Sequence, residues 1–143
     1  MIDFLPGINA TASALNAERV RMDVITQNIA NANTTQGIDG KPYQRQQVVF
    51  ESVLNQQISD PAGAQPQPVR VARVETDKRP PQLVYKPGDP SADKNGMVAM
   101  PNINIHEEMA DLITSSRAFE ANLAVLKNAR AMALQELNIG KTG

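Results

Sequence analysis

The sequence has no cysteine and no tryptophan, and aromatic residues make up only 3% of its 143 residues. Without cysteine the chain cannot form disulfides, thiolate nucleophiles or cysteine-ligated metal centres. Its hydrophobic residues, 41% of the total, are mostly Ala, Val, Leu, Ile and Met. This composition suits contacts between helices better than an aromatic-rich enzyme core. The length fits one ordinary domain.

Three other features are also lacking. The chain has 14 basic and 15 acidic residues and a net charge of −1, so no basic excess is available to neutralise nucleic-acid phosphates. No run of 18 apolar residues indicates a membrane span. Residues 1–7 contain neither a basic region nor a long apolar run, so we expect no Sec-type signal peptide.

The last long stretch of the chain, residues 104–138, is predicted to form one long helix. Asn104 is a candidate N-cap, Glu107 follows three residues later as in a capping box, and Gly140 occupies the place of a C-cap glycine. Apolar residues recur in steps of four and three, which is typical of a helix that packs along its length. This predicted seam consists of Ile105, Met109, Leu112, Ser116, Phe119, Leu123, Leu126, Arg130, Ala133 and Leu137.

A second helix is predicted over residues 5–31. Its seam positions lie seven residues apart, with two further residues between them. They are Ile8, Leu15, Met22 and Ile29, with Ala12 and Ile25. The Asn- and Thr-rich segment that follows favours caps and turns, and ends the helix.

Between the helices, proline and short β-like runs replace helical periodicity. Eight of the ten prolines lie between residues 38 and 100. Strands are predicted at residues 43–54, 69–74, 82–85 and 97–100, and the loops at residues 60–68 and 86–95. The fold class is therefore α+β, with helical residues 1–36, a β-rich insert with a thin core at 37–101, and helical residues 102–143.

The two helices are expected to pair as a coiled-coil hairpin. A helix of about 35 residues is roughly 50 Å long, whereas a globule of this chain length is roughly 30 to 40 Å across. Two such seams facing only each other would leave apolar surface exposed, which indicates an interface with other chains. The alternative is that the seams hold only one hairpin within the chain. Alone, the terminal helices should be marginally stable.

Catalytic and metal-binding patterns are incomplete. The single histidine, His106, precedes Glu107 as in a zinc-peptidase helix, but Ala110 stands where the second histidine is needed. Asp89 and Asp93 lie in a segment that lacks the twelve-residue Ca²⁺ pattern. We therefore expect no enzyme, no cofactor, no metal and no small-molecule substrate. An enzyme built on His106 is the minor alternative.

Residues 27–35, Gln-Asn-Ile-Ala-Asn-Ala-Asn-Thr-Thr, resemble the signature at the end of the first helix in bacterial flagellar axial proteins of the rod and hook. Further segments are similar to those of the proximal rod members of that family. They are residues 37–43, 47–50, 83–90, 93–102, 107–109, 116–122 and 125–126. Phe119 departs from the tyrosine expected there, and residues 60–68 match poorly.

The resemblance implies a structural subunit of the flagellar proximal rod. Such a protein is exported by the flagellar type III apparatus without a cleaved signal. It polymerises in the periplasmic space with its helices as an inner coiled-coil layer and its β insert outside, and it transmits motor torque. Its implied partners are copies of itself, other proximal and distal rod proteins, a rod-base adaptor and the export apparatus. A soluble coiled-coil adaptor or secretion chaperone is the alternative.

The expected assembly surface combines seam residues with the asparagines of the signature. It consists of Leu15, Met22, Ile25, Ile29, Asn28, Asn31, Asn33, Leu112, Phe119, Leu123, Leu126, Arg130 and Leu137. The three asparagines have two interpretations: a plain helix stop, or a shaped junction whose amides hydrogen-bond across subunits. The residues alone leave both open, and the resemblance favours the second.

Overall fold

The structure, a computed structural model, describes residues 5–37, 39–52 and 68–139. Its elements are α1 (Leu5–Ala30), β1 (Gln46–Ser52), β2 (Val69–Thr76), β3 (Gln82–Tyr85), β4 (Met97–Met100) and α2 (Ile105–Ile139). The predicted α+β class and the order helix, strands, helix are confirmed. The predicted strand end at residues 53–54, most of the loop at 60–68, and Gly140 lie outside the described residues.

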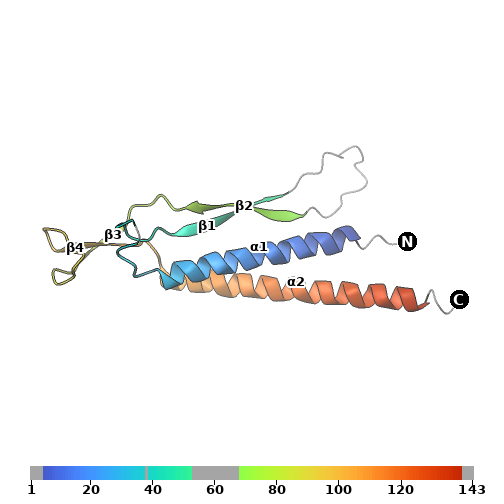
Figure 1. The fold of residues 1–143 in the computed structure, drawn as a ribbon. Coiled ribbons are helices and arrows are strands. Elements are labelled where there is room, and N and C mark those ends of the chain that lie inside the picture. The colour runs from blue at the N-terminus through green and yellow to red at the C-terminus, as the bar shows by residue number, and fades with distance from the viewer. Residues whose placement is uncertain (1–4, 38, 53–67, 140–143) are drawn as a thin grey trace.

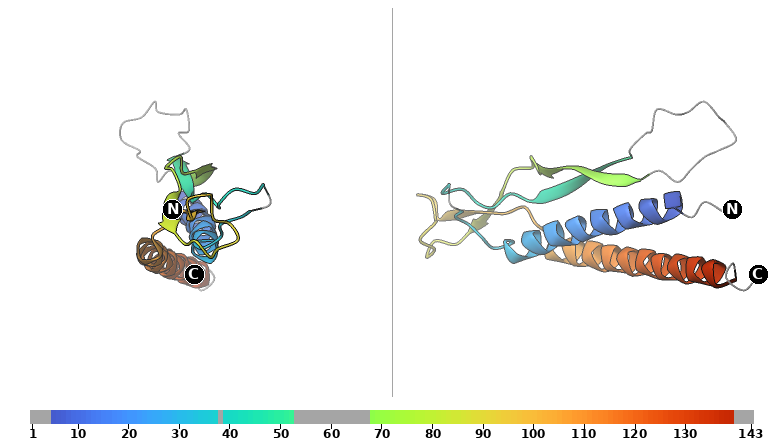
Figure 2. Two further views of the ribbon diagram at one scale, coloured as in Figure 1. Left: turned by 90° about the vertical axis from the view of Figure 1, so that its left-hand side faces the viewer. Right: turned by 45° about the vertical axis from the view of Figure 1, so that its right-hand side comes forward.

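The two helices run antiparallel and side by side, with α1 in the middle of the molecule (Figure 1). The hairpin of β1 and β2 covers one side of α1, and α2 covers another, as the end-on view in Figure 2 shows. α2 extends past Leu5, the first described residue of α1 (Figure 1). β3 and β4 lie at the opposite end of the molecule. Neither helix, over its described length, is apolar enough to cross a membrane.

Local side-chain hydrogen bonds set the helix ends near the strands. The Asn104 carboxamide oxygen accepts a hydrogen bond from the His106 N–H at 3.1 Å, which confirms the predicted N-cap of α2. At the end of α1, the Asn31 side-chain amide donates to the Gln27 carbonyl at 2.9 Å, and the Thr34 hydroxyl donates to Asn31 Oδ1 at 3.2 Å. Asn31 therefore acts as a helix stop.

The strands form two separate antiparallel pairs, β1 with β2 and β3 with β4. The register of the first pair shifts between Val49 and Phe50. The buried hydrophobic residues of the described chain are few: Ala17, Val24, Ile25, Ala32 and Val98. Only Val98 among them lies in the strands, which agrees with the thin core expected of the insert.

The face that α2 turns towards α1 differs from the predicted seam at alternate positions. Glu108 and Ser115 are each 1% exposed, whereas Met109 is 50% exposed and Leu137 is 65% exposed. The buried and half-buried positions that recur in steps of three and four form the observed seam. They are Glu108, Leu112, Ser115, Phe119, Asn122, Leu126, Ala129 and Ala133. Leu112, Phe119, Leu126 and Ala133 of the predicted seam are on this face, and Ser116 and Leu123 are also half-buried, whereas Ile105, Met109, Arg130 and Leu137 are exposed.

A similar displacement occurs on α1, because this helix must cover two neighbours rather than one. Ala17 and Val24 are buried, although neither was predicted as a seam residue. Leu15 and Met22 are half-buried, and Ala12 is exposed. The small Ala17 side chain lets α1 approach its neighbours closely. The helix pair is thus established, whereas coiled-coil packing along the predicted seams stays a prediction.

The loop between β3 and β4 depends on one glycine with a positive φ. Gly96 has φ 74°, and a Cβ there would lie 3.0 Å from a ring carbon of Tyr85. Its carbonyl accepts a hydrogen bond from the Lys86 N–H at 2.8 Å. The Asp93 carboxylate accepts from the N–H groups of Asn95 and Met97 at 2.8 and 2.9 Å. This carboxylate thus shapes the turn.

We expect Gly96→Ala to open this turn. The left-handed conformation costs a non-glycine residue about 1–2 kcal/mol, and the contact with Tyr85 adds to that cost. Amide exchange at Lys86 should accelerate by about five- to thirtyfold, as that range of free energy implies. Gly88→Ala is the matched control, because its Cβ would meet nothing within 4 Å. Equal exchange in the two variants would contradict the assigned role of Gly96.

Candidate functional site

A cluster of polar side chains joins both helices to the strands where α1 ends and α2 begins. We call this cluster the junction. Its members come from α1, from the segment before β1, from the segment after β2 and from the first turn of α2. They are Asn28, Tyr43, Arg45, Asp77, Arg79 and Glu108.

Asn28 is the centre of the junction and is only 1% exposed. Its amide nitrogen donates to the Gln46 carbonyl at 2.8 Å and to Glu108 Oε2 at 3.0 Å. Its oxygen accepts from the Gln46 N–H at 2.9 Å and from the Tyr43 hydroxyl at 3.1 Å. An asparagine side chain has two donor and two acceptor positions, so all four are used. The pair of bonds to Gln46 resembles strand pairing and fixes the start of β1.

Glu108 supplies the negative charge of the junction from the first turn of α2. Its carboxylate is 1% exposed and accepts a hydrogen bond from Arg45 Nε at 2.6 Å as well as the bond from Asn28. A buried carboxylate is tolerated when it is paired and hydrogen-bonded in this way. Removing one partner of such a pair typically costs about 3–5 kcal/mol. The contact therefore holds α2 against α1 and β1 at one defined place.

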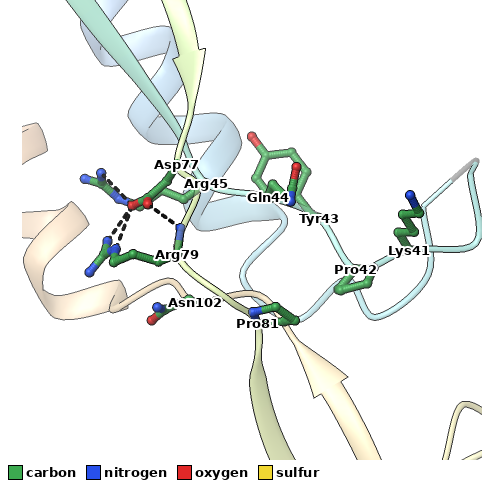
Figure 3. A pocket seen from close by; sticks show the side chains of 9 residues that line it. All are labelled: Lys41, Pro42, Tyr43, Gln44, Arg45, Asp77, Arg79, Pro81 and Asn102. Carbon is green, nitrogen blue, oxygen red and sulfur yellow. Dashed lines mark hydrogen bonds and ion pairs between the residues drawn. The ribbon is translucent and has the colours of Figure 1, made fainter.

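Asp77 and Arg79 close the junction on the strand side (Figure 3). The Arg79 side chain forms an ion pair with Asp77 Oδ2 at 2.7 Å. The backbone N–H of Arg79 donates to Asp77 Oδ1 at 3.0 Å. These bonds lower the pKa of Asp77 below its usual value. Arg45 Nη1 lies 3.9 Å from the same carboxylate, and the Asp77 N–H donates to the Arg45 carbonyl at 2.7 Å. Arg45 thus links the two acidic groups.

A pocket of about 200 Å³ opens beside the junction (Figure 3). Its lining residues are Lys41, Pro42, Tyr43, Gln44, Arg45, Asp77, Arg79, Pro81 and Asn102. The charged groups of the junction in this lining already pair with one another, as the dashed lines in Figure 3 show for Asp77. The described residues contain no group of three or more acidic or histidine side chains that could hold a metal ion. His106 is exposed on α2. The arrangement is that of a structural support.

Apart from the signature asparagines, the residues expected to form an assembly surface lie outside the junction. Most are half-buried: Leu15, Met22, Ile29, Leu112, Phe119, Leu123 and Leu126. Arg130 and Leu137 are exposed, whereas Ile25 is buried at 5% exposure. The members of this predicted surface therefore lie along both helices of the antiparallel pair.

The three signature asparagines have different environments. Asn28 uses its whole hydrogen-bonding capacity within the chain, so the hypothesis that its amide bonds across subunits is replaced by an intrachain role. Asn31 fits the helix-stop interpretation. Asn33 is exposed in the turn that follows α1.

The sequence analysis missed the other junction residues. Arg45 and Asp77 belong to segments with no distinctive motif. One signal was available for Glu108: it lies four residues before Leu112 and seven before Ser115, on the observed seam.

Comparison with known proteins places both helices in one group of proteins. Residues 8–37 match the family described as flagella basal body rod protein, and residues 94–139 match the family described as flagellar basal body rod FlgEFG protein C-terminal. The flagellar basal-body rod protein FlgC of Borreliella burgdorferi is 41% identical over 140 residues, covering 87% of this chain and 90% of the relative. The chain belongs to the FlgC family of flagellar basal-body rod proteins.

Other FlgC proteins match to a similar extent. The FlgC protein of Yersinia enterocolitica is 40% identical, covering 90% of this chain and 92% of the relative. That of Bacillus subtilis is 39% identical, covering 94% and 96%. These relatives are named as flagellar basal-body rod proteins, so the predicted structural role in the flagellar basal body is confirmed and the adaptor or chaperone alternative is not favoured. Asn28 and Glu108 fall in the two matched segments.

Replacing Asn28 or Asn33 of the FlgC signature by alanine tests whether the two side chains differ in their contribution to stability. Asn28→Ala removes one of the two hydrogen bonds to Glu108 and leaves the Gln46 backbone groups without their Asn28 partners, and should lower the free energy of unfolding by roughly 2–4 kcal/mol. The matched control, Asn33→Ala, removes an exposed side chain and should stay within about 0.5 kcal/mol of the parent. Urea unfolding followed by circular dichroism measures both. Similar losses in the two variants would contradict the central role of Asn28.

The pKa of Tyr43 provides a second test of the junction. Burial of the phenol raises this pKa above its usual value of 10.0, and the charge on Glu108 raises it further. Because the folded state holds the proton more tightly, the stability that Tyr43 contributes is complete below pH 10 and declines as the pH rises through the folded-state pKa.

In a Tyr85→Phe variant, Tyr43 is the only remaining tyrosine of the two in the chain. We expect its absorbance titration to have a midpoint above 10 in the folded chain and to move back towards 10 in denaturant. A midpoint at or below 10 under native conditions would show that the phenol does not lie beside the Glu108 carboxylate.

Proposed function

We propose that this FlgC-family chain is a proximal-rod subunit that polymerises through its terminal helices with copies of itself and with other rod proteins. In this proposal, residues 1–36 and 102–143 form the inner coiled-coil layer of a tube, and residues 37–101 lie outside it. The tube acts as the drive shaft that transmits motor torque towards the distal rod and hook. The partners at its ends are the rod-base adaptor and the distal rod proteins.

One observation carries this proposal: α2 exposes large apolar side chains along its whole length, although it is already paired with α1. They are Ile105, Met109, Ile113, Val125, Met132, Leu134 and Leu137. The described chain buries fewer hydrophobic residues than this within itself. Exposed apolar surface of this extent on one helix usually marks an interface between proteins.

The length of α2 adds a second argument for partner chains. The last turns of α2 extend past Leu5 of α1 (Figure 1), and Leu137 in this region is 65% exposed. No other described residue of the chain buries Leu137 further. A neighbouring subunit in a tube would cover it. We therefore assign the half-buried and exposed members of the predicted surface to contacts between subunits, and Asn28 and Ile25 to support from within.

The energetics of assembly follow from this exposure. Burial of apolar surface stabilises the polymer by roughly 25 cal/mol for each Å² removed from water. Ordering the helix ends opposes this, at about 1–2 kcal/mol for each backbone residue that becomes fixed. An isolated chain gains little from its exposed residues, so the far ends of the helices become fully ordered only in the rod. The chain thereby stays monomeric and exportable until it meets a growing end.

We further propose how the chain reaches the rod. The family role requires export through the flagellar type III apparatus without a cleaved signal, followed by assembly in the periplasmic space. The absence of cysteine is compatible with this route, because no disulfide can form prematurely in an oxidising compartment.

The proposal is tested by a charge placed on the far end of α2. We expect Leu137→Asp to abolish rod assembly and motility, because the carboxylate would have to be buried against a neighbouring subunit. The isolated variant should keep the helix content of the parent, since Leu137 is largely exposed there. Motility, electron microscopy of basal bodies and circular dichroism provide the three measurements.

Gln135→Asp is the matched control. It introduces the same charge two residues away, and at about 100° per residue it lies on nearly the opposite side of the helix. It should leave motility close to that of the parent. Normal rods with Leu137→Asp, or equal loss with both variants, would show that this face of α2 does not contact neighbouring subunits.

A further inference from the structure

α2 has two faces that could pack on α1, and the chain uses the less apolar of them. The predicted and observed seams share Leu112, Phe119, Leu126 and Ala133. They differ at the positions between. There the predicted seam has Ile105, Met109, Ser116, Leu123, Arg130 and Leu137, and the observed seam has Glu108, Ser115, Asn122 and Ala129. Changing from one seam to the other requires only a partial rotation of α2 about its own axis.

Burial of apolar area alone would favour the predicted seam. Met109 is 50% exposed, and burying it would stabilise a helix pair more than burying Ser115 does. Ser115 is 1% exposed, and its hydroxyl has no hydrogen-bond partner among the described residues. A buried hydroxyl without a partner is unfavourable. The free energy gained by burying its residues therefore does not explain why α2 turns this face towards α1.

The contacts of Glu108 explain why α2 packs on α1 with this face. Asn28 is fixed by two hydrogen bonds to the Gln46 backbone, which orient its remaining N–H towards α2. Arg45 points at the same carboxylate from the segment before β1. A rotation of α2 that brought Met109 inwards would move Glu108 away from both donors. It would leave the buried Asn28 amide without its acceptor and the Arg45 guanidinium with only the longer contact to Asp77, which is unfavourable.

We propose that Asn28, Arg45 and Glu108 form a register lock, which selects the face of α2 that meets α1. Buried polar contacts have this use in coiled coils, where they fix register at a cost in stability. The lock keeps Met109 exposed, and with it the rest of the apolar face that the proposed assembly uses. This consequence for assembly rests on the proposed function, whereas the selection of the face concerns the single chain.

Two adjacent serines allow the face to be measured. The chain has no cysteine, so Ser115→Cys and Ser116→Cys each introduce one thiol without changing the side-chain size greatly. Ser115 is on the observed seam and fully buried, and Ser116 is on the predicted seam and half-buried. In the otherwise unchanged chain, we expect the Ser116→Cys variant to react with a maleimide about tenfold faster than the Ser115→Cys variant, because buried thiols react only after local opening.

In a variant without the lock, the order of the two maleimide reaction rates should reverse. Arg45→Met with Glu108→Leu replaces the whole ion pair by apolar side chains, a change that preserves folding better than removal of one charge. In this background we expect the thiol at position 115 to react faster and the thiol at position 116 to react more slowly, at unchanged helix content. Glu108→Gln retains a hydrogen-bond acceptor and should keep the original order of rates. Adding Met109→Ser to the double variant weakens the competing face and should partly restore that order.

Three results would overturn the lock: an unchanged ratio in the double variant, faster reaction of both thiols, or loss of helix content. The last two would show that the contacts contribute only stability. Motility of the same strains tests the proposed function separately. Exchanged rates with normal motility would support the lock and contradict the proposed assembly face. Unchanged rates with lost motility would overturn the lock and leave the assembly proposal intact.

Discussion

The hydrogen bond between the buried Asn28 amide and the buried Glu108 carboxylate is the contact on which the other parts of this structure depend. It joins α1 to α2, and the remaining bonds of the two side chains reach β1 and Arg45. The described core contains few large apolar side chains. Directional contacts therefore have to set the relative position of the helices, because nonspecific burial is weak and would favour a different face.

Stability is consequently uneven along the molecule. Buried polar contacts concentrate at one end of the helix pair, where Glu108 and Ser115 are almost inaccessible. Exposure rises towards the other end, where Met132, Leu134 and Leu137 lie in solvent. A subunit of this kind has a defined base and helix ends that depend on neighbours. That distribution agrees with the proposed assembly, in which neighbouring subunits cover the far ends of the helices.

Local features of this fold could be predicted from the sequence, and non-local ones could not. The strand Met97–Met100 after the Asn95-Gly96 turn and the Asn104 cap are short-range effects, so residue type and spacing were sufficient. The seam of α2 was predicted from apolar residues alone, and it failed at Met109 because the competing residue was a charged one, Glu108. No pattern in a single sequence indicates that an arginine before β1 will neutralise a glutamate 63 residues later.

The separation of the junction residues along the chain also affects the time at which the fold can form. Asn28 and Glu108 are 80 residues apart, and the segments that carry Arg45 and Asp77 lie between them. Individual helices form in about a microsecond or less, whereas contacts between distant residues form late and slowly because a long loop must close first. A chain with this topology is therefore a slow folder for its size. The junction is therefore expected to form after the two helices, which are not held against each other until its contacts close.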